Sequence, residues 1–199
     1  MRFASPLALF LSTLLLSSTP ARGHLAVDLG GGILVPFDDE QRDAYGTAPV
    51  VTLGVAAGLG GERTWAFLDV GFVPDSGDEF FSDPTFENVE AEYRLVPITL
   101  GVRTDFVKPA LRSRASIYGG VAWQTIFTRW EGPFGDAEST PTFGIVFELR
   151  PEVQVASRYS IWLRQRVAFI GDAKYDFARD LNYSGSTLEA GLSWRSGIP

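Results

Sequence analysis

The segment at residues 142–156, TFGIVFELRPEVQVA, alternates between apolar and polar residues. One face carries apolar residues from Phe143 to Val155, and the other carries Glu148, Arg150 and Glu152. Successive side chains of a strand point to opposite faces, so this period of two predicts a β-strand between two different environments. Such a strand fits a soluble barrel with its charges outside or a membrane barrel with its charges inside.

Similar apolar-periodic segments recur along the chain, separated by clusters of turn residues, and no helical periodicity of useful length lies between them. We count eight: 24–36, 49–59, 63–73, 91–106, 114–128, 142–156, 158–170 and 185–195. Plentiful glycine (21) and proline (12) agree with a protein of strands and turns.

The connections between these segments alternate strictly in length. Those at 60–63, 107–114 and 156–160 are short, and those at 37–48, 74–90, 129–140 and 171–184 are long. The long connections and their flanks hold 17 of the 24 acidic residues, so the two ends of the molecule differ in charge. An even number of strands with short turns at one end predicts an all-β, eight-stranded antiparallel up-and-down transmembrane β-barrel.

The polar face of the segments carries nearly balanced charges and many glycines. The charged residues are Asp28, Asp69, Arg103, Asp105, Glu148, Arg150, Glu152, Arg164, Arg166, Glu189 and Arg195. Inside a narrow barrel glycines make room and charges must pair, because an unpaired buried charge costs several kcal/mol. We therefore predict that this face lines a salt-bridged lumen and that the apolar face meets lipid. A soluble lipocalin-like carrier would require the reverse arrangement.

Two features do not fit this alternation. Trp65, Phe67 and Trp162 fall on the inward side, where the sequence alone offers no reason for them. Pro151 lies within a segment although proline cannot donate a hydrogen bond to a ladder, and we predict a local bulge there.

The amino-terminal residues have the order of a secretory signal peptide. Arg2 precedes an apolar run from Leu7 to Leu16, and small residues follow at Ala21 and Gly23. The run is shorter than the roughly 20 residues of a membrane-spanning helix. We predict a signal peptide at 1–23 and one barrel domain at 24–199.

Three stretches resemble strands of the small eight-stranded outer-membrane β-barrel proteins of Gram-negative bacteria, the OmpA/OmpX-like class. They are YRLVPITLGVRTDF (93–106), IYGGVAW (117–123) and TLEAGLSWR (187–195). The resemblance implies an outer-membrane location with both termini in the periplasm. It also implies a barrel insertion machinery that reads an aromatic residue of the last strand, here Trp194, although five residues follow it.

The chain offers little material for catalysis. It has no cysteine, and its single histidine, His24, lies at the predicted mature terminus, a poor place for a general base. Glu148 and Glu152 flank Arg150 on one strand face, where ion pairing explains them without a reaction. We therefore predict that the protein is not an enzyme and needs no cofactor. An outer-membrane lipid-modifying barrel enzyme remains an alternative, as does a small-solute or ion channel.

The predicted partners follow from charge. A net charge of −7 argues against nucleic acid, which requires clustered Lys and Arg. Acids in the long connections predict contact with lipopolysaccharide through divalent cations, and the Phe residues of 74–90 could contact an extracellular partner. The same stretch resembles a calcium loop only loosely, because it lacks the ordered ligand pattern. The sequence thus predicts a structural or surface-interaction protein of the outer membrane.

Overall fold

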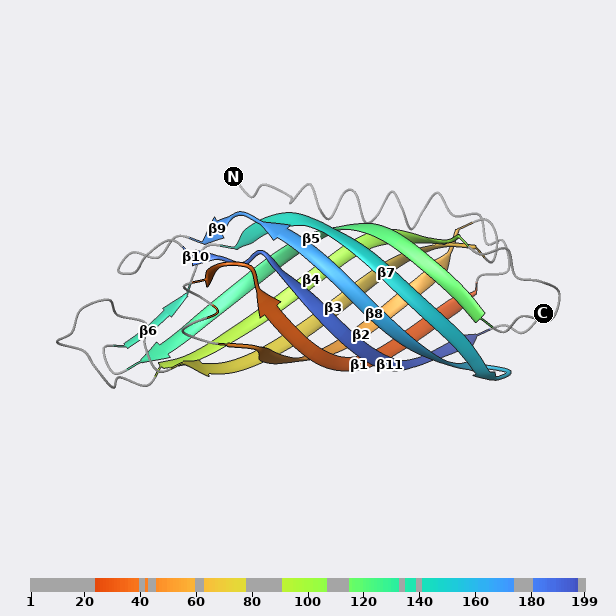
Figure 1. Ribbon diagram of the computed structural model, residues 1–199, viewed down its shortest axis with the longest axis horizontal. Coiled ribbons are helices and arrows are strands. Elements are labelled where there is room, and N and C mark those ends of the chain that lie inside the picture. Colours follow the sequence, from red (N-terminus) through yellow and green to blue (C-terminus); the bar gives the residue numbers. More distant parts are fainter. Residues whose placement is uncertain are drawn as a thin grey trace, which may run out of the picture.

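The computed structural model describes residues 24–39, 42, 46–59, 63–77, 91–106, 115–132, 135–138, 141–173 and 181–196. Eight long strands form a closed barrel (Figure 1). They are β1 (Leu25–Pro36), β2 (Ala48–Gly58), β3 (Thr64–Gly77), β4 (Ala91–Asp105), β5 (Ala115–Gly132), β7 (Thr142–Ala156), β8 (Tyr159–Ile170) and β11 (Gly185–Ser196). The predicted fold class is confirmed, and each predicted segment overlaps one of these strands.

The barrel closes through the pairing of its first and last strands, β1 and β11. β1 pairs antiparallel with both β2 and β11, and β4 pairs with β5, while β5 continues to β7. Leu25 lies opposite Ser196, so the first and last strands meet at the end of the barrel that has the short turns. A closed antiparallel barrel leaves no strand edge unpaired, as a membrane requires.

Three short strands, none of them predicted, lie at the other end of the barrel (Figure 1). β6 (Gly135–Glu138) pairs with the far end of β5, and β9 (Asp172–Ala173) pairs with β10 (Leu181–Asn182). They fall in segments that the sequence assigns to long connections. These connections therefore contain regular structure that lacks an alternating pattern.

The two faces of the barrel wall differ as predicted. Outward residues such as Leu29, Ile161 and Leu192 are about half exposed, whereas the inward residues between them are buried. The outer surface is an apolar band with exposed aromatic side chains, of which Phe143 and Phe169 lie near the ends of β7 and β8. Among the described residues, no helix is long and apolar enough to cross a membrane.

The predicted bulge at Pro151 is wrong. Between β7 and β8 the pairs Leu149–Gln165 and Glu152–Trp162 keep one register across the proline, although the two positions between them are unpaired. The register shifts nearer the turn, between Gln154 and Ala156. The missing proline N–H thus interrupts the ladder without inserting a residue, because Pro151 points outward and leaves the inward register of its neighbours intact.

Candidate functional site

The lumen near the short-turn end is filled by a first cluster built on Asp28 of β1. Arg150 of β7 donates two hydrogen bonds to its carboxylate, Nη1 to Oδ2 at 2.6 Å and Nη2 to Oδ1 at 3.0 Å. Arg103 of β4 donates a third to Oδ2 at 3.1 Å. Bidentate pairing of a guanidinium with a carboxylate is among the stronger charge-assisted arrangements, so Asp28 is held from across the barrel.

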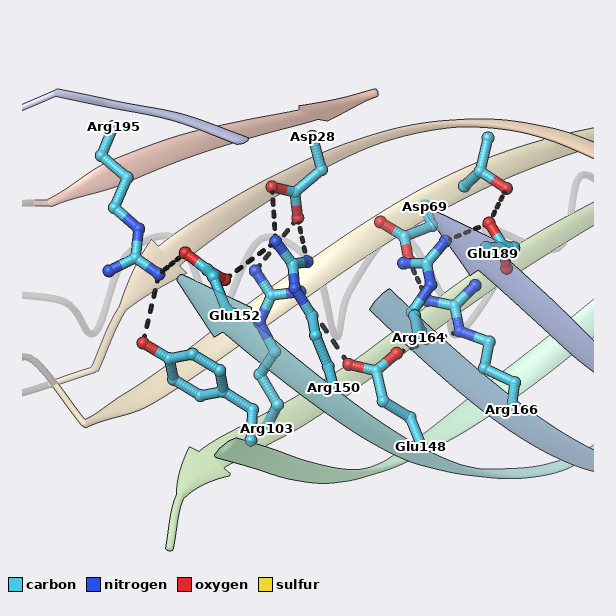
Figure 2. Close-up of polar contacts among 12 residues, drawn as sticks. Asp28, Asp69, Arg103, Glu148, Arg150, Glu152, Arg164, Arg166, Glu189 and Arg195 are labelled. Atoms are coloured by element: carbon cyan, nitrogen blue, oxygen red, sulfur yellow. Dashed lines mark hydrogen bonds and ion pairs between the residues drawn. The ribbon is translucent and has the colours of Figure 1, made fainter. Parts of the chain in front are cut away.

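The same cluster extends toward the barrel end through Glu152. Arg150 Nη2 lies 3.1 Å from Glu152 Oε2, and Arg195 of β11 pairs with the other oxygen of that carboxylate. Arg195 also donates to the Tyr118 hydroxyl at 3.1 Å. The first cluster therefore consists of Asp28, Arg103, Arg150, Glu152 and Arg195 (Figure 2).

A second cluster lies farther along the lumen, around Arg164 and Arg166 of β8. Arg164 bridges Asp69 of β3 at 2.7 Å and Glu189 of β11 at 2.6 Å. Arg166 pairs with Asp69 and, through Nε, with Glu148 at 3.0 Å. The Thr52 hydroxyl donates to Glu189 at 2.7 Å, so this carboxylate of β11 is held from both β8 and β2.

The two clusters form one electrically balanced network. The first has three arginines and two carboxylates, the second has two arginines and three carboxylates, and Arg103 lies 3.9 Å from Glu148 between them. Arg150 and Arg164 are both 0% exposed. Removing so many charges from water is costly, and only mutual pairing makes it tolerable.

The inward aromatic residues complete this network. The centroid of the Trp162 ring lies 4.6 Å from the guanidinium carbon of Arg150 and 4.8 Å from that of Arg164. Cations over an aromatic face are attracted to its negative quadrupole, and most strongly when both are desolvated. A Cβ at Gly30 or Gly191 would overlap this ring, so these two glycines create the space that it occupies.

Phe67 and Trp65 also contact guanidinium groups, at other positions along the lumen. Phe67 lies 5.5 Å from the Arg103 guanidinium carbon and 5.6 Å from that of Arg166, and Trp65 lies 5.1 Å from that of Arg195. The sequence does indicate contacts between inward aromatic residues and lumen arginines, because Trp162, Arg164 and Arg166 share one strand face. Each of the three inward aromatic residues thus packs against at least one lumen arginine.

Gly30 offers a test of this packing. We expect Gly30→Ala to lower the free energy of unfolding by about 1–3 kcal/mol, because overpacking forces the trapped Trp162 ring to move. Urea titration in lipid vesicles measures the change. Gly31→Ala is the matched control, because its Cβ would meet Val50 O at an ordinary 3.4 Å. Equal stability of the two variants would contradict the proposed role of Gly30.

Ten of the eleven charged residues predicted to share the lumen are joined by these ion pairs. The eleventh, Asp105, is half-buried at the end of β4, where its carboxylate accepts a hydrogen bond from the Ile117 N–H at 3.4 Å. His24 lies just before β1 at the same barrel end.

The lumen beyond the second cluster contains a group of buried apolar residues, which the sequence did not reveal. We call this part the outer chamber; its buried walls include Val50, Val73, Leu95, Ile126 and Tyr183. It encloses a cavity of about 50 Å³ that reaches Arg166 and Glu189. β2 illustrates why it was missed, because residues on both of its faces are apolar and no alternation distinguishes them.

No group of His, Asp or Glu within the described ranges is arranged to hold a metal ion. The stretch that loosely resembles a calcium loop, 74–90, lies mostly outside the described residues. The arrangement in the lumen is thus one of mutually paired charges, each cation facing protein carboxylates.

No family model matches this sequence, and no curated protein matches it. Solved structures do resemble the barrel. Neisserial surface protein A (NspA) has a TM-score of 0.59 at 14% identity, covering 86% of this chain and 96% of its own. The outer membrane protein OprG from Pseudomonas aeruginosa has a TM-score of 0.65 at 12% identity, covering 88% and 97%. A major outer membrane protein from Thermus thermophilus has a TM-score of 0.56 at 14% identity, covering 87% and 99%. The chain therefore has the fold of small outer-membrane β-barrels, and the predicted architectural resemblance is confirmed.

Proposed function

We propose that the protein is an outer-membrane β-barrel whose lumen is closed to ions along its axis and whose role is structural or one of surface interaction. In this proposal the short turns and both termini face the periplasm, and the long acidic connections face outward. The observation that supports it is the lumen network of five arginines and five carboxylates, all of them buried except Arg195.

The network closes the lumen because its bonds cross it. Asp28 of β1 pairs with Arg150 of β7, and Asp69 of β3 pairs with Arg164 of β8, although neither pair of strands is adjacent in the barrel. A permeating ion would have to separate these charge-assisted hydrogen bonds and leave charges uncompensated. Breaking one such buried pair costs about 3–5 kcal/mol, a substantial barrier even before the ion is dehydrated.

Conductance recording in planar bilayers tests this closure. We expect the native protein to show no steady open level, and Asp28→Ser/Arg150→Ser to show discrete current steps, because two large charged side chains leave the lumen together. Arg158→Ser, at an exposed turn residue, is the control and should stay silent. A steady large conductance of the native protein would reject the closed lumen and favour the channel alternative.

We assign no catalytic role to the lumen carboxylates. Glu148 and Glu152 are buried and paired with arginines inside the barrel, on the side of the wall that faces away from lipid. Neither carboxylate is placed to reach an outer-membrane lipid.

The proposed partners are lipid and a surface ligand. Lipopolysaccharide phosphates would be bridged by divalent cations to acids of the long connections, and the insertion machinery would read the last strand at Trp194. Most of the residues in those connections lie outside the described ranges. Loss of co-purifying lipopolysaccharide on chelation would support the bridge, and its retention would exclude it.

A further inference from the structure

The short connections of the barrel are basic, and their charge is unevenly distributed. Their basic residues are Arg63, Lys108, Arg112, Arg114 and Arg158, and their one acid is Glu62. Four of the five basic residues belong to the β2–β3 and β4–β5 connections, whereas the β7–β8 connection has one. Because β3 and β4 are neighbours in the barrel, the sequence concentrates positive charge in the connections that adjoin this pair of strands.

Arg63 is the basic residue that the structure describes beside β3. It is exposed and makes no ion pair with any residue in the described ranges. Its carbonyl oxygen accepts a hydrogen bond from the Asp105 N–H at 2.9 Å, so Arg63 is fixed against the end of β4. Asp105 is two residues from Arg103 and therefore points to the same, lumen side of β4. The charge of Arg63 is thus open to an external anion.

Phe106, the residue that follows β4, is 67% exposed, the largest fraction among the exposed large apolar residues of the described ranges. Its ring is nevertheless held in place. A Cβ on Gly119 of β5 would overlap the ring, so Phe106 rests on the bare backbone of this glycine. Gly119 pairs with the outward residue Thr104, and the ring therefore covers the outer face of the barrel at its end. Aromatic residues in such places are typical of a membrane–water interface.

Two hydroxyl groups lie beside this ring on the outer face. Thr64 and Thr104 are opposite each other on β3 and β4, and their Oγ1 atoms are 3.0 Å apart. One hydroxyl donates to the other, so the pair keeps one O–H that can donate to an external acceptor. Farther along the same face come Val102 and Val121, which are 46% and 54% exposed and lie opposite each other.

We propose that Arg63, Thr64, Thr104 and Phe106, which we call the corner patch, bind the headgroup of an anionic phospholipid such as phosphatidylglycerol. The phosphate contacts the guanidinium and the free hydroxyl, and an acyl chain lies along Val102 and Val121. A guanidinium forms strong charge-assisted hydrogen bonds with phosphate. The inference rests on the proposed function, in which the short turns face the periplasm, so that the lipid belongs to the periplasmic leaflet.

The arrangement of the corner patch favours a phospholipid over a soluble anion. From the barrel end inward, the outer face presents a cation, then hydroxyls beside an aromatic ring, then aliphatic side chains. A phospholipid has its anionic, glycerol and acyl parts in the same order. A soluble anion would use the cation alone and would leave Phe106 exposed to water.

The experiment uses the full protein in detergent micelles and counts bound lipids by native mass spectrometry. The probes are phosphatidylglycerol and phosphatidylethanolamine with identical acyl chains, which differ in net charge. We expect phosphatidylglycerol to bind about fivefold more tightly, the effect of one basic residue near an anionic headgroup. Arg63→Gln should abolish this preference, and Arg63→Lys should retain part of it. Equal affinities of the native protein for the two lipids would overturn the proposal.

Arg158→Gln is the matched control, because Arg158 is an exposed arginine at the same end of the barrel but outside the corner patch. It should keep the native preference, and a loss as large as that of Arg63→Gln would show a general charge effect and overturn the site. Phe106→Ala should weaken both lipids about equally, since the ring contacts the parts they share. Unchanged affinities of Phe106→Ala would equally count against the site, once each variant shows the heat-modifiable mobility of a folded barrel.

The leaflet is tested separately from the site. Arg158→Cys places the chain's single thiol in the β7–β8 turn, and a membrane-impermeant maleimide should fail to label it on intact cells. Labelling would show that the short turns face outward and would overturn the periplasmic leaflet as the source of the lipid. The affinities in micelles do not depend on orientation, so failure of the proposed topology and failure of the corner patch give different results.

Discussion

Replacing Arg150 with methionine lowers the free energy of unfolding by about 3–5 kcal/mol, the cost of removing one partner from a buried ion pair. The side chain is 0% exposed, and the Asp28 carboxylate receives two of its hydrogen bonds from it. Without Arg150, Asp28 loses these two hydrogen bonds and keeps the one from Arg103, and Glu152 loses a partner 3.1 Å away. Reversible urea unfolding in lipid vesicles, followed by tryptophan fluorescence, measures the loss.

Three further variants make this result specific. Arg158→Met removes an exposed arginine and should change stability by no more than about 0.5 kcal/mol. Arg150→Lys keeps the charge but loses the bidentate geometry, so its cost should lie between the native protein and Arg150→Met. Asp28→Asn/Arg150→Met should cost less than the sum of the single changes, because the stranded carboxylate is gone. Additive effects would show that the pair does not act as a unit.

The sequence predicted the strands best where the two faces of a strand meet different surroundings. β7 and β8 alternate between lipid-facing residues and lumen charges, and their predicted bounds differ from the structure by at most one residue. β3 and β5 extend four residues beyond their predicted ends, toward the long connections. There the chain leaves the region that requires one apolar face, and alternation no longer marks a strand.

The composition of the lumen network could be predicted, but its pairing could not. The alternation along each strand identifies which side chains point into the lumen. The relative register of all eight strands decides which of these side chains contact one another. Asp28 pairs with Arg150, 122 residues away, and Asp69 with Arg164, 95 residues away. No local pattern records such cross-lumen pairs, and for the same reason the contact of the Trp162 ring with Arg150 of β7 could not be predicted.

The outer chamber escaped prediction for a different reason. Its walls are apolar residues at inward positions, on strands whose outward positions are apolar as well. A strand with apolar residues on both faces does not show in its sequence which face points into the lumen. The pairing register of the strands is therefore needed to place these apolar residues beyond the charged network. Pro97 likewise reads as an irregularity in sequence, and only the pairing shows that it lies beside the chamber.

Placing a charge on the lipid-facing surface has the second large effect. Leu192 of β11 points outward between Leu29 and Ile161, and these three side chains are 55%, 57% and 48% exposed. Leu192→Arg should lower the free energy of unfolding into water by about 2–4 kcal/mol, because an arginine near the bilayer midplane must be removed from water without a partner. Urea unfolding in lipid vesicles measures it.

The dependence of this cost on depth in the bilayer distinguishes exposure to lipid from a steric effect of the larger side chain. Val155→Arg is the matched control, since Val155 is also outward and 49% exposed but lies one residue from the end of β7, near the membrane surface. There an arginine should cost only about 0–1 kcal/mol. If the apolar band faced water, as in a secreted carrier, both arginines would be harmless and the protein would stay in the aqueous phase without detergent. Equal small effects at both positions would therefore contradict the membrane barrel, whereas a large difference between them follows from a lipid environment around Leu192.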